Sequence, residues 1–112
     1  MILTTAQLAC IAGLIGLPAP TEPVIFHAVP PTRAYEIAAR ATGIPGAVGV
    51  TIGETAVIPD DYATRTNPVN IHVHEAVHVL FRQAGVEYDW REENVAARVA
   101  NVTFEAWCAA PT

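Results

Sequence analysis

The chain has 112 residues, of which 52% are hydrophobic and 15% are charged, and its formal net charge is −5. This length suffices for one domain with a buried core, and the apolar content argues against a disordered chain. The acidic balance, with only six scattered basic residues, argues against a surface for nucleic acid or for an anionic membrane, so we expect neither as a partner.

The N-terminal stretch predicts a short helix. Thr4 and Gln7 have the spacing of a capping box, Leu3 and Leu8 have that of a hydrophobic staple, and Gly16 is placed to end the helix. A signal peptide is disfavoured, because no basic residue precedes the apolar segment and the place for cleavage is rich in proline. The segment is too short to span a bilayer, so we expect a helix packed on the domain rather than a membrane anchor or a propeptide.

The middle of the chain predicts a strand, a helix and a β-hairpin. The apolar run 24–29 lies between prolines and predicts a strand, and a helix is expected over 31–42, before Gly43. Residues 47–58 alternate in polarity around a two-residue turn that begins at Gly53, which is typical of a hairpin. We expect one of these strands to form an edge beside the active site, where an extended peptide can add as a further strand.

Residues 74–78 read His-Glu-Ala-Val-His, the pattern H-E-x-x-H. On a helix, His74 and His78 lie one turn apart on the same face and can bind one metal ion. Glu75 lies beside them and can take a proton from a metal-bound water without binding the metal itself. The pattern therefore predicts zinc, with His74 and His78 as ligands and Glu75 as the general base.

The flanking sequence places this motif within one helix of about 17 residues. Asn67 suits the N-cap, Pro68 suits the first helical position, and Gly85 suits a left-handed C-cap. Apolar residues recur between them at helical spacing: Val69, Val73, Val77, Leu80, Phe81 and Ala84.

A final helix is predicted from about Trp90 to Cys108. The residues expected to bury it against the motif helix are Val95, Ala96, Val99, Val102, Ala106 and Trp107. Cys10 and Cys108 could pair in an oxidising compartment, but two cysteines without a short spacing form neither a disulfide framework nor a zinc knuckle, so we expect free thiols.

A catalytic zinc site usually has three protein ligands and leaves a fourth position for water. His72 is rotated by about 200° from His74 around the helix, away from the metal face. His27 lies in an apolar strand, where a histidine is more often a packed residue than a ligand. A carboxylate from the final helix is therefore the better third ligand.

Glu93 and Glu92 compete for this position. Asp89 and Glu92 have the spacing of a capping pair, which gives Glu92 a separate structural role. Small residues follow Glu93 on its side of the helix, so the two helices can approach closely enough for its carboxylate to reach the zinc. We therefore prefer Glu93, with Glu92 as the main alternative and Glu87 and Asp89 as further ones.

The H-E-x-x-H motif, a short loop, and then Glu93-x-x-Ala96-x-x-Val99-Ala100 resemble the gluzincin metallopeptidases. The pattern is most similar to the small ImmA/IrrE-type metallopeptidases of phages and mobile elements, and the resemblance covers about residues 30–107. It implies an α+β, zincin-like fold in which a small sheet packs on the motif helix and on a ligand-bearing C-terminal helix. It also implies that Glu93 is the third zinc ligand.

We therefore expect a zinc-dependent metallopeptidase that hydrolyses a peptide or protein, in the cytoplasm of a bacterial host or in a virion. We expect one domain over residues 1–112, with an N-terminal helix and proline-rich linker over 1–23 and the metallopeptidase core over 24–112. Tyr62, Tyr88 and His27 are candidate oxyanion donors, although each is more typical of a structural role.

Two other functions stay open. One is a non-catalytic, zinc-stabilised structural or interaction module, for example a phage component; a fourth protein ligand such as His27 or Cys10 would favour it, because catalysis needs an open position. The other is a metal-dependent hydrolase that acts on something other than a peptide. The intact Glu75 argues against the first, because a structural site needs no general base.

Overall fold

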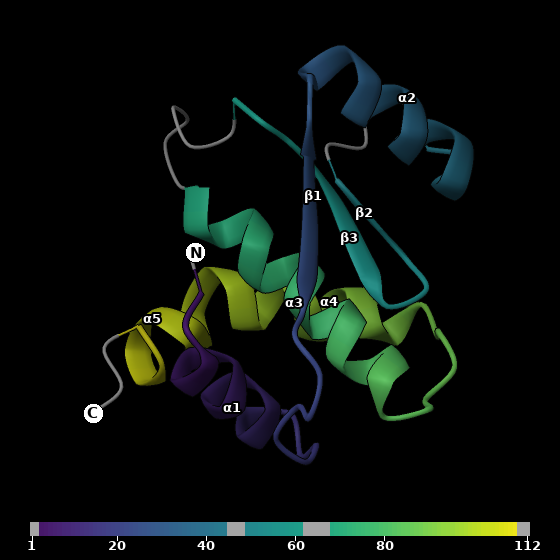
Figure 1. The fold of residues 1–112 in the computed structure, drawn as a ribbon. Helices are drawn as coiled ribbons and strands as arrows, with labels where there is room; N and C mark the ends of the chain where they lie inside the picture. The colour runs from purple at the N-terminus through teal and green to yellow at the C-terminus, as the bar shows by residue number, and fades with distance from the viewer. Residues whose placement is uncertain (1–2, 45–48, 62–67, 110–112) are drawn as a thin grey trace.

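A three-stranded mixed sheet and a long central helix form the frame of this α+β fold (Figure 1). The computed structural model describes residues 3–44, 49–61 and 68–109. Its elements are α1 (Thr5–Leu14), β1 (Ile25–Val29), α2 (Pro31–Thr42), β2 (Val50–Ile52), β3 (Thr55–Pro59), α3 (Pro68–Gln83), α4 (Arg91–Arg98), the π-helical segment η2 (Val99–Thr103) and α5 (Phe104–Trp107). The expectation of an α+β fold is thus confirmed.

The sheet has the strand order β1-β3-β2, with β1 parallel to β3 and β2 antiparallel to it. The predicted hairpin is confirmed, since Ile52 pairs with Thr55 across a two-residue turn. Gly53 has a φ of 62° in this turn, a conformation that favours glycine. At the start of β2, a Cβ on Gly49 would lie 2.9 Å from Cδ1 of Ile71, so the absence of a side chain lets the hairpin approach α3 closely. The predicted strand positions 47 and 48 lie outside the described residues.

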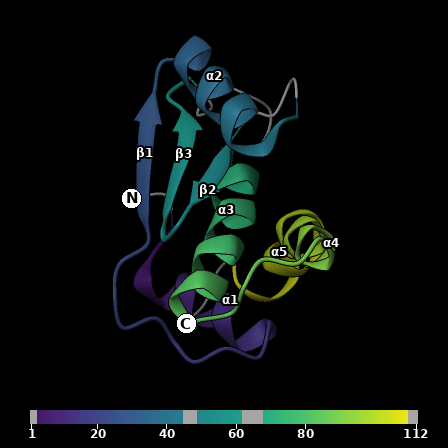
Figure 2. The ribbon, with the colours of Figure 1, turned by 90° about the vertical axis from the view of Figure 1, so that its right-hand side faces the viewer.

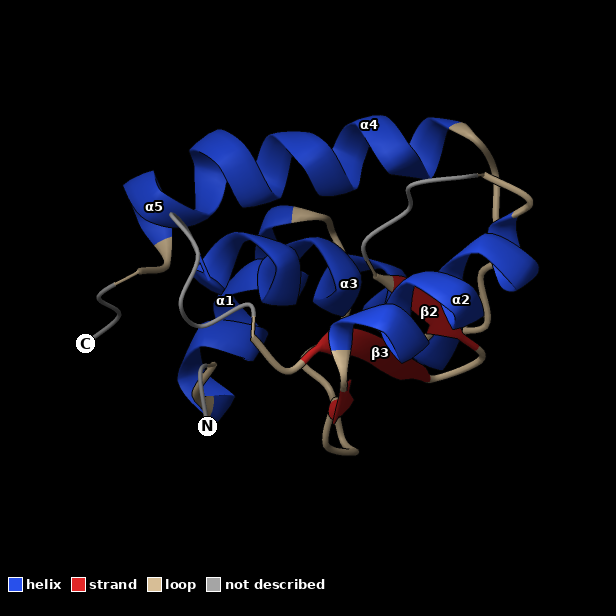
Figure 3. Ribbon diagram, turned by 90° about the horizontal axis from the view of Figure 1, so that it is seen from above, coloured by secondary structure: helices blue, strands red, loops and turns tan. Residues whose placement is uncertain are grey.

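The sheet, α3 and the helical run from α4 to α5 follow one another as layers (Figure 2). Viewed from above, α4, η2 and α5 form one nearly continuous rod that lies alongside α3 (Figure 3). α2 contacts all three strands, and α1 packs against α3. α3 is therefore covered by the sheet and by the C-terminal rod, and the site described below lies where these layers meet.

The predicted helix ends are confirmed for α1 and α2. The Thr4 hydroxyl accepts from the backbone N–H of Gln7, and the Gln7 side chain accepts from the backbone N–H of Thr4, which completes the capping box. α2 begins at Pro31 and ends before Gly43, whose φ is 71°. The prolines and glycines of the sequence thus mark these boundaries correctly.

α3 confirms the predicted motif helix, with 16 residues that begin at Pro68 and with Gly85 beyond its end at a φ of 78°. Asn67, the predicted N-cap, lies outside the described residues. Val73, Val77 and Leu80 are buried in the main core, as their spacing predicts. None of the helices in residues 3–44 and 68–109 combines the length and the apolar character needed to cross a membrane.

The predicted face of the C-terminal helix is only partly correct. Ala96 and Val99 are buried, but Val95, Val102, Ala106 and Trp107 are exposed. The buried apolar positions are Ala96, Ala100, Phe104 and Cys108, each four residues from the next, together with Val99. In a regular α-helix a spacing of four drifts around the axis by about 40° per step. The π-helical bonds of η2 reach one residue further, as from Phe104 N–H to the Val99 carbonyl, and so keep this spacing on one face.

The expectation of free thiols is wrong, because Cys10 and Cys108 form a disulfide. Cys10 lies in α1 and Cys108 directly follows α5, and the two Cα atoms are 5.7 Å apart. The Gln7 amide also donates to the Ala109 carbonyl at 2.8 Å, so the two ends of the described chain contact each other at two points. The wide sequence separation of 98 residues hid this pairing, because only the packing of α1 near α5 brings the cysteines together.

Candidate metal centre

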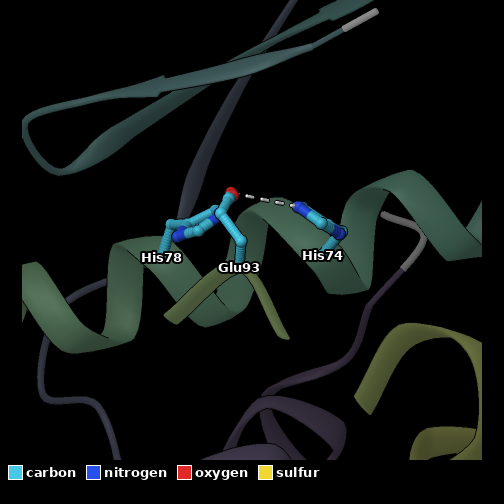
Figure 4. Close-up of side chains that lie close together, drawn as sticks. All are labelled: His74, His78 and Glu93. Atoms are coloured by element: carbon cyan, nitrogen blue, oxygen red, sulfur yellow. Dashed lines mark ion pairs between the residues drawn. The ribbon is translucent and has the colours of Figure 1, made fainter. Parts of the chain in front are cut away.

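His74, His78 and Glu93 converge at one point between α3 and α4 (Figure 4). Oε1 of Glu93 lies 2.7 Å from Nε2 of His78 and 3.6 Å from Nε2 of His74. One ligand atom from each of the three residues lies within 4.8 Å of the others. The two histidines are one helical turn apart on α3, and Glu93 reaches them from the first turn of α4. The structure thus brings together the three residues that the sequence predicted as ligands.

The donor set fits zinc in number and in chemistry. Two imidazole nitrogens and one carboxylate oxygen form a catalytic type of zinc site, which keeps one position open. Zinc bonds of about 2.1 Å in a tetrahedral site hold neighbouring donor atoms roughly 3.4 Å apart. The separation of 3.6 Å between His74 and Glu93 is close to this value, and that of 2.7 Å between His78 and Glu93 requires a shift of under 1 Å.

Glu92 has a different role from the one predicted. Its buried carboxylate contacts Nδ1 of His78 through one oxygen and the guanidinium of Arg82 through the other. Nδ1 is the nitrogen that does not face Glu93, so Glu92 holds the His78 ring with Nε2 directed toward the candidate site. A carboxylate behind a metal-binding histidine fixes both the orientation and the tautomer of the ring.

The predicted capping pair of Asp89 and Glu92 is not formed, because Asp89 instead binds Arg91. Its carboxylate accepts from the backbone N–H of Arg91 at 2.9 Å and from the Arg91 guanidinium at 2.9 and 3.0 Å. These hydrogen bonds lower the pKa of Asp89 to about 2. Asp89 and the exposed Glu87 do not belong to the group formed by His74, His78 and Glu93.

Glu75 is buried beside the two histidines and is held by β2. The Thr51 hydroxyl donates to Oε2 of Glu75 at 2.6 Å and lies 3.3 Å from the backbone carbonyl of the same residue. Burial raises the pKa of Glu75 above its ordinary value, while the Thr51 hydrogen bond and the nearby histidines act in the opposite direction. A raised pKa makes this carboxylate a stronger base than an exposed one, which suits a role in proton transfer.

A cavity of about 600 Å³ opens onto this group of residues. Glu75, His78 and Glu93 line it on one side, and the end of α2 and the strand β2 line the other. In the described sheet β2 is an outer strand, because it pairs only with β3. The prediction that a hairpin strand forms an edge is therefore confirmed for the described sheet, and this edge lies beside the candidate site.

Tyr88 is the one described candidate for the oxyanion donor that lines this cavity. The Tyr88 ring centroid lies 6.0 Å from the ring centroid of His78 and 5.8 Å from the Arg82 guanidinium carbon. Partial burial and the nearby Glu93 raise the pKa of Tyr88, so its hydroxyl keeps its proton. Tyr62 lies outside the described residues.

The remaining histidines lie away from the centre. His72 is buried with its ring 4.9 Å from that of Phe26, which confirms that it faces away from the side of α3 that carries His74 and His78. His27 is exposed on the outer strand β1, so its predicted packing is wrong, and it does not line the cavity. Neither His27 nor the disulfide-bonded Cys10 supplies a fourth ligand.

Four polar residues of α3 form a stripe along its contact with the C-terminal rod: Asn70, His74, His78 and Arg82. Each is four residues from the next, so the four side chains form a continuous row that turns gradually around α3, by about 40° per step. The Asn70 amide donates to the Ala100 carbonyl at 3.1 Å and also to the Asn101 side chain. The stripe thus contacts the C-terminal rod on both sides of Glu93, through Arg82 to Glu92 of α4 and through Asn70 to η2. These contacts fix how far along α3 the Glu93 carboxylate lies.

Sequence reasoning did not single out three of these supporting residues. Arg82 had a usable signal, because it follows His78 by four residues and must share its face. Thr51 had no such signal, because 24 residues separate it from Glu75 and only the packing of β2 on α3 brings the two together. Asn70 lies four residues before His74, as His74 does before His78. Its acceptor, however, is the Ala100 carbonyl of η2, which is found only once the two helices are placed side by side.

A scan against models of protein families found no match, and searches of curated proteins and of solved structures likewise found none.

Proposed function

We propose that the protein is a zinc-dependent metallopeptidase. The observation that carries this proposal is the meeting of His74, His78 and Glu93 from two helices, beside a cavity that His78, Glu93 and Glu75 line. A metal site alone would need no carboxylate beside it, whereas hydrolysis needs a proton acceptor within reach of the attacking water.

His74, His78 and Glu93 are the residues that would hold the zinc. When bound there, zinc would lower the pKa of a water molecule toward neutrality and polarise the scissile carbonyl. Glu92 keeps the His78 ring aligned for this role, and the Arg82 guanidinium compensates the charge of the buried Glu92 carboxylate. Neither Glu92 nor Arg82 needs to contact the substrate.

Glu75 is the proposed general base. Because Thr51 binds Oε2, we expect Oε1 to accept the proton of the attacking water. Glu75 then passes this proton to the nitrogen of the leaving amine, which could not depart as an anion at neutral pH. The hydrogen bond from Thr51 keeps the carboxylate in place during both transfers.

A peptide is the proposed substrate because an outer strand borders the site. The side of β2 that pairs with no other described strand offers backbone donors and acceptors to an extended chain, which can add to the sheet as a further strand. Such binding would bring a peptide bond beside Glu75, since Thr51 of β2 is already hydrogen-bonded to that residue.

The finer assignment to the gluzincins, and to the ImmA/IrrE-type enzymes among them, is part of this proposal. It is supported by the order of elements: a helix, a hairpin, the motif helix and then a helix with a glutamate ligand. The placement of Glu93 rather than Glu92 beside both histidines agrees with the glutamate of that pattern.

Peptide cleavage by the zinc-loaded protein tests the proposal. We expect the wild type to cleave an unstructured protein such as casein, and Glu75→Gln to bind the same amount of zinc with activity reduced by at least 100-fold. Glu54→Gln, on the exposed hairpin turn, is the matched control and should keep full activity. Zinc binding without cleavage in the wild type would favour a structural module instead.

A further inference from the structure

The two sides of the cavity differ in chemistry. The α3–α4 side carries every charged group of the described lining: Glu75, Glu93, Arg82 and, when protonated, His78. The other side belongs to the end of α2, to Ile44 shortly after it and to the β2 hairpin. It contains no charged residue and includes Ala41, Thr42, Ile44, Val50, Thr51 and Ile52. The second set is called the α2–β2 wall below.

Two isoleucines of the α2–β2 wall are largely exposed to solvent. Ile44 is 61% exposed and Ile52 is 50% exposed, and both line the cavity. They come from different elements, Ile44 after α2 and Ile52 at the end of β2. Because removing apolar surface from water favours association, an apolar side chain placed between them gains binding free energy that a polar one does not.

The charges at the cavity disfavour an acidic side chain. The guanidinium of Arg82 is paired with the buried carboxylate of Glu92, which offsets its positive charge. Glu75 and Glu93 place two carboxylates at the cavity. A basic side chain against the α2–β2 wall would also lose hydration without gaining an ion pair from that wall.

We infer that the cleft selects peptides that place a large, uncharged apolar side chain against the α2–β2 wall, with Ile44 and Ile52 as the specificity-determining residues. This inference rests on the proposed peptidase function and names the substrate class of that site. The backbone of the peptide lies along β2, and the selected side chain contacts Ile52 at one end of that strand.

A set of matched peptides tests the selection. The probes are quenched-fluorescence decapeptides of alanine and serine that carry one Leu, Phe, Asp or Lys at each position in turn. For zinc-loaded wild type we expect one position at which Leu or Phe gives a kcat/KM at least tenfold above that for Asp or Lys. Fluorescence anisotropy on zinc-loaded Glu75→Gln should rank the dissociation constants in the same order.

Substitutions in the α2–β2 wall test whether Ile44 and Ile52 cause the selectivity. Ile52→Asp and Ile44→Asp should each raise KM for the Leu peptide by fivefold or more, with little change in kcat. Ile52→Lys should improve cleavage of the Asp peptide relative to the Leu peptide. The control is Ile25→Asp, because Ile25 on β1 is 46% exposed, which matches Ile52, but does not line the cavity. It should leave both peptides unaffected.

The outcomes of these experiments distinguish a failure of the proposed selectivity from a failure of the proposed peptidase function. If all peptides are cleaved at similar rates, or if Ile25→Asp acts like Ile52→Asp, the selectivity is contradicted and the peptidase function stands. If no peptide is cleaved by zinc-loaded wild type, the peptidase function is contradicted. In that case the anisotropy ranking still decides whether the cleft prefers apolar side chains.

Discussion

The Thr51 hydroxyl on β2 donates a hydrogen bond of 2.6 Å to Oε2 of Glu75 on α3. This contact joins the outer strand of the sheet to the residue that we propose as the general base. It also opposes the rise in the Glu75 pKa that burial causes. The hydrogen bond thus holds the proposed general base at a fixed position relative to the strand that would bind the substrate.

Thr51→Val should raise the pKa of Glu75 further, because it removes a hydrogen bond that lowers it. The base is active only when deprotonated, so the acidic limb of the kcat/KM profile should move to higher pH. Thr51→Ser keeps the hydroxyl and should restore the wild-type limb, with zinc content unchanged in both variants. An unshifted limb in Thr51→Val would show that the bond does not tune the base.

Glu75→Gln should change how the stability of the zinc-free protein depends on pH. The folded pKa of Glu75 is raised above the ordinary value of 4.5, so its contribution to stability is complete below that value and is lost as pH rises through the folded pKa. Glutamine does not ionise, so the melting temperature of the variant should gain on that of wild type between pH 4.5 and 7.5 in the presence of a chelator. A constant difference across this range would contradict the raised pKa.

Glu92→Gln should weaken zinc binding by about 10- to 100-fold, because it loses the charged partner of His78 Nδ1 while Glu93 stays in place. Competition with a chromophoric chelator measures the dissociation constant. Glu87→Gln changes an exposed carboxylate in the preceding loop and is the matched control. If Glu92→Gln abolished zinc binding altogether and Glu93→Gln did not, Glu92 would be the ligand and the assignment of the two residues would be reversed.

The disulfide should stabilise the fold by tying α1 to the end of α5. A crosslink that closes about 100 residues is worth roughly 4 to 5 kcal/mol in the chain-entropy description, and engineered cases often give less. The double variant Cys10→Ser/Cys108→Ser should therefore melt well below wild type under non-reducing conditions. Thiol titration of the unfolded wild type should find no free thiol before reduction and two after it. Two free thiols before reduction would contradict the pairing.

The sequence predicted the parts of this fold that local chemistry decides. The capping box at Thr4, the turn at Gly53 and the left-handed residue at Gly85 each act within a few residues, and each is confirmed. The spacing of His74 and His78 likewise placed both on one helical face. Such features need no knowledge of distant parts of the chain.

The predictions that proved wrong concern residues whose position depends on contacts between distant segments of the chain. The disulfide depends on how α1 packs near α5, and the inward position of Glu92 depends on how α4 crosses α3. The buried face of the C-terminal rod depends on η2, which regular helical periodicity does not include. Residue spacing was enough to predict the H-E-x-x-H motif. The residues that support it could be identified only from the packing of the helices and of β2.

Zinc stoichiometry tests the central claim most directly. Elemental analysis after dialysis should find one zinc per chain in wild type and in the control Glu105→Gln, whose carboxylate is exposed on α5. It should find a loss of most of the metal in His74→Ala and in Glu93→Ala, with melting temperatures of the zinc-free proteins close to that of zinc-free wild type. A wild type that binds no zinc, or a Glu93→Ala variant that keeps all of it, would contradict the metal centre formed by His74, His78 and Glu93.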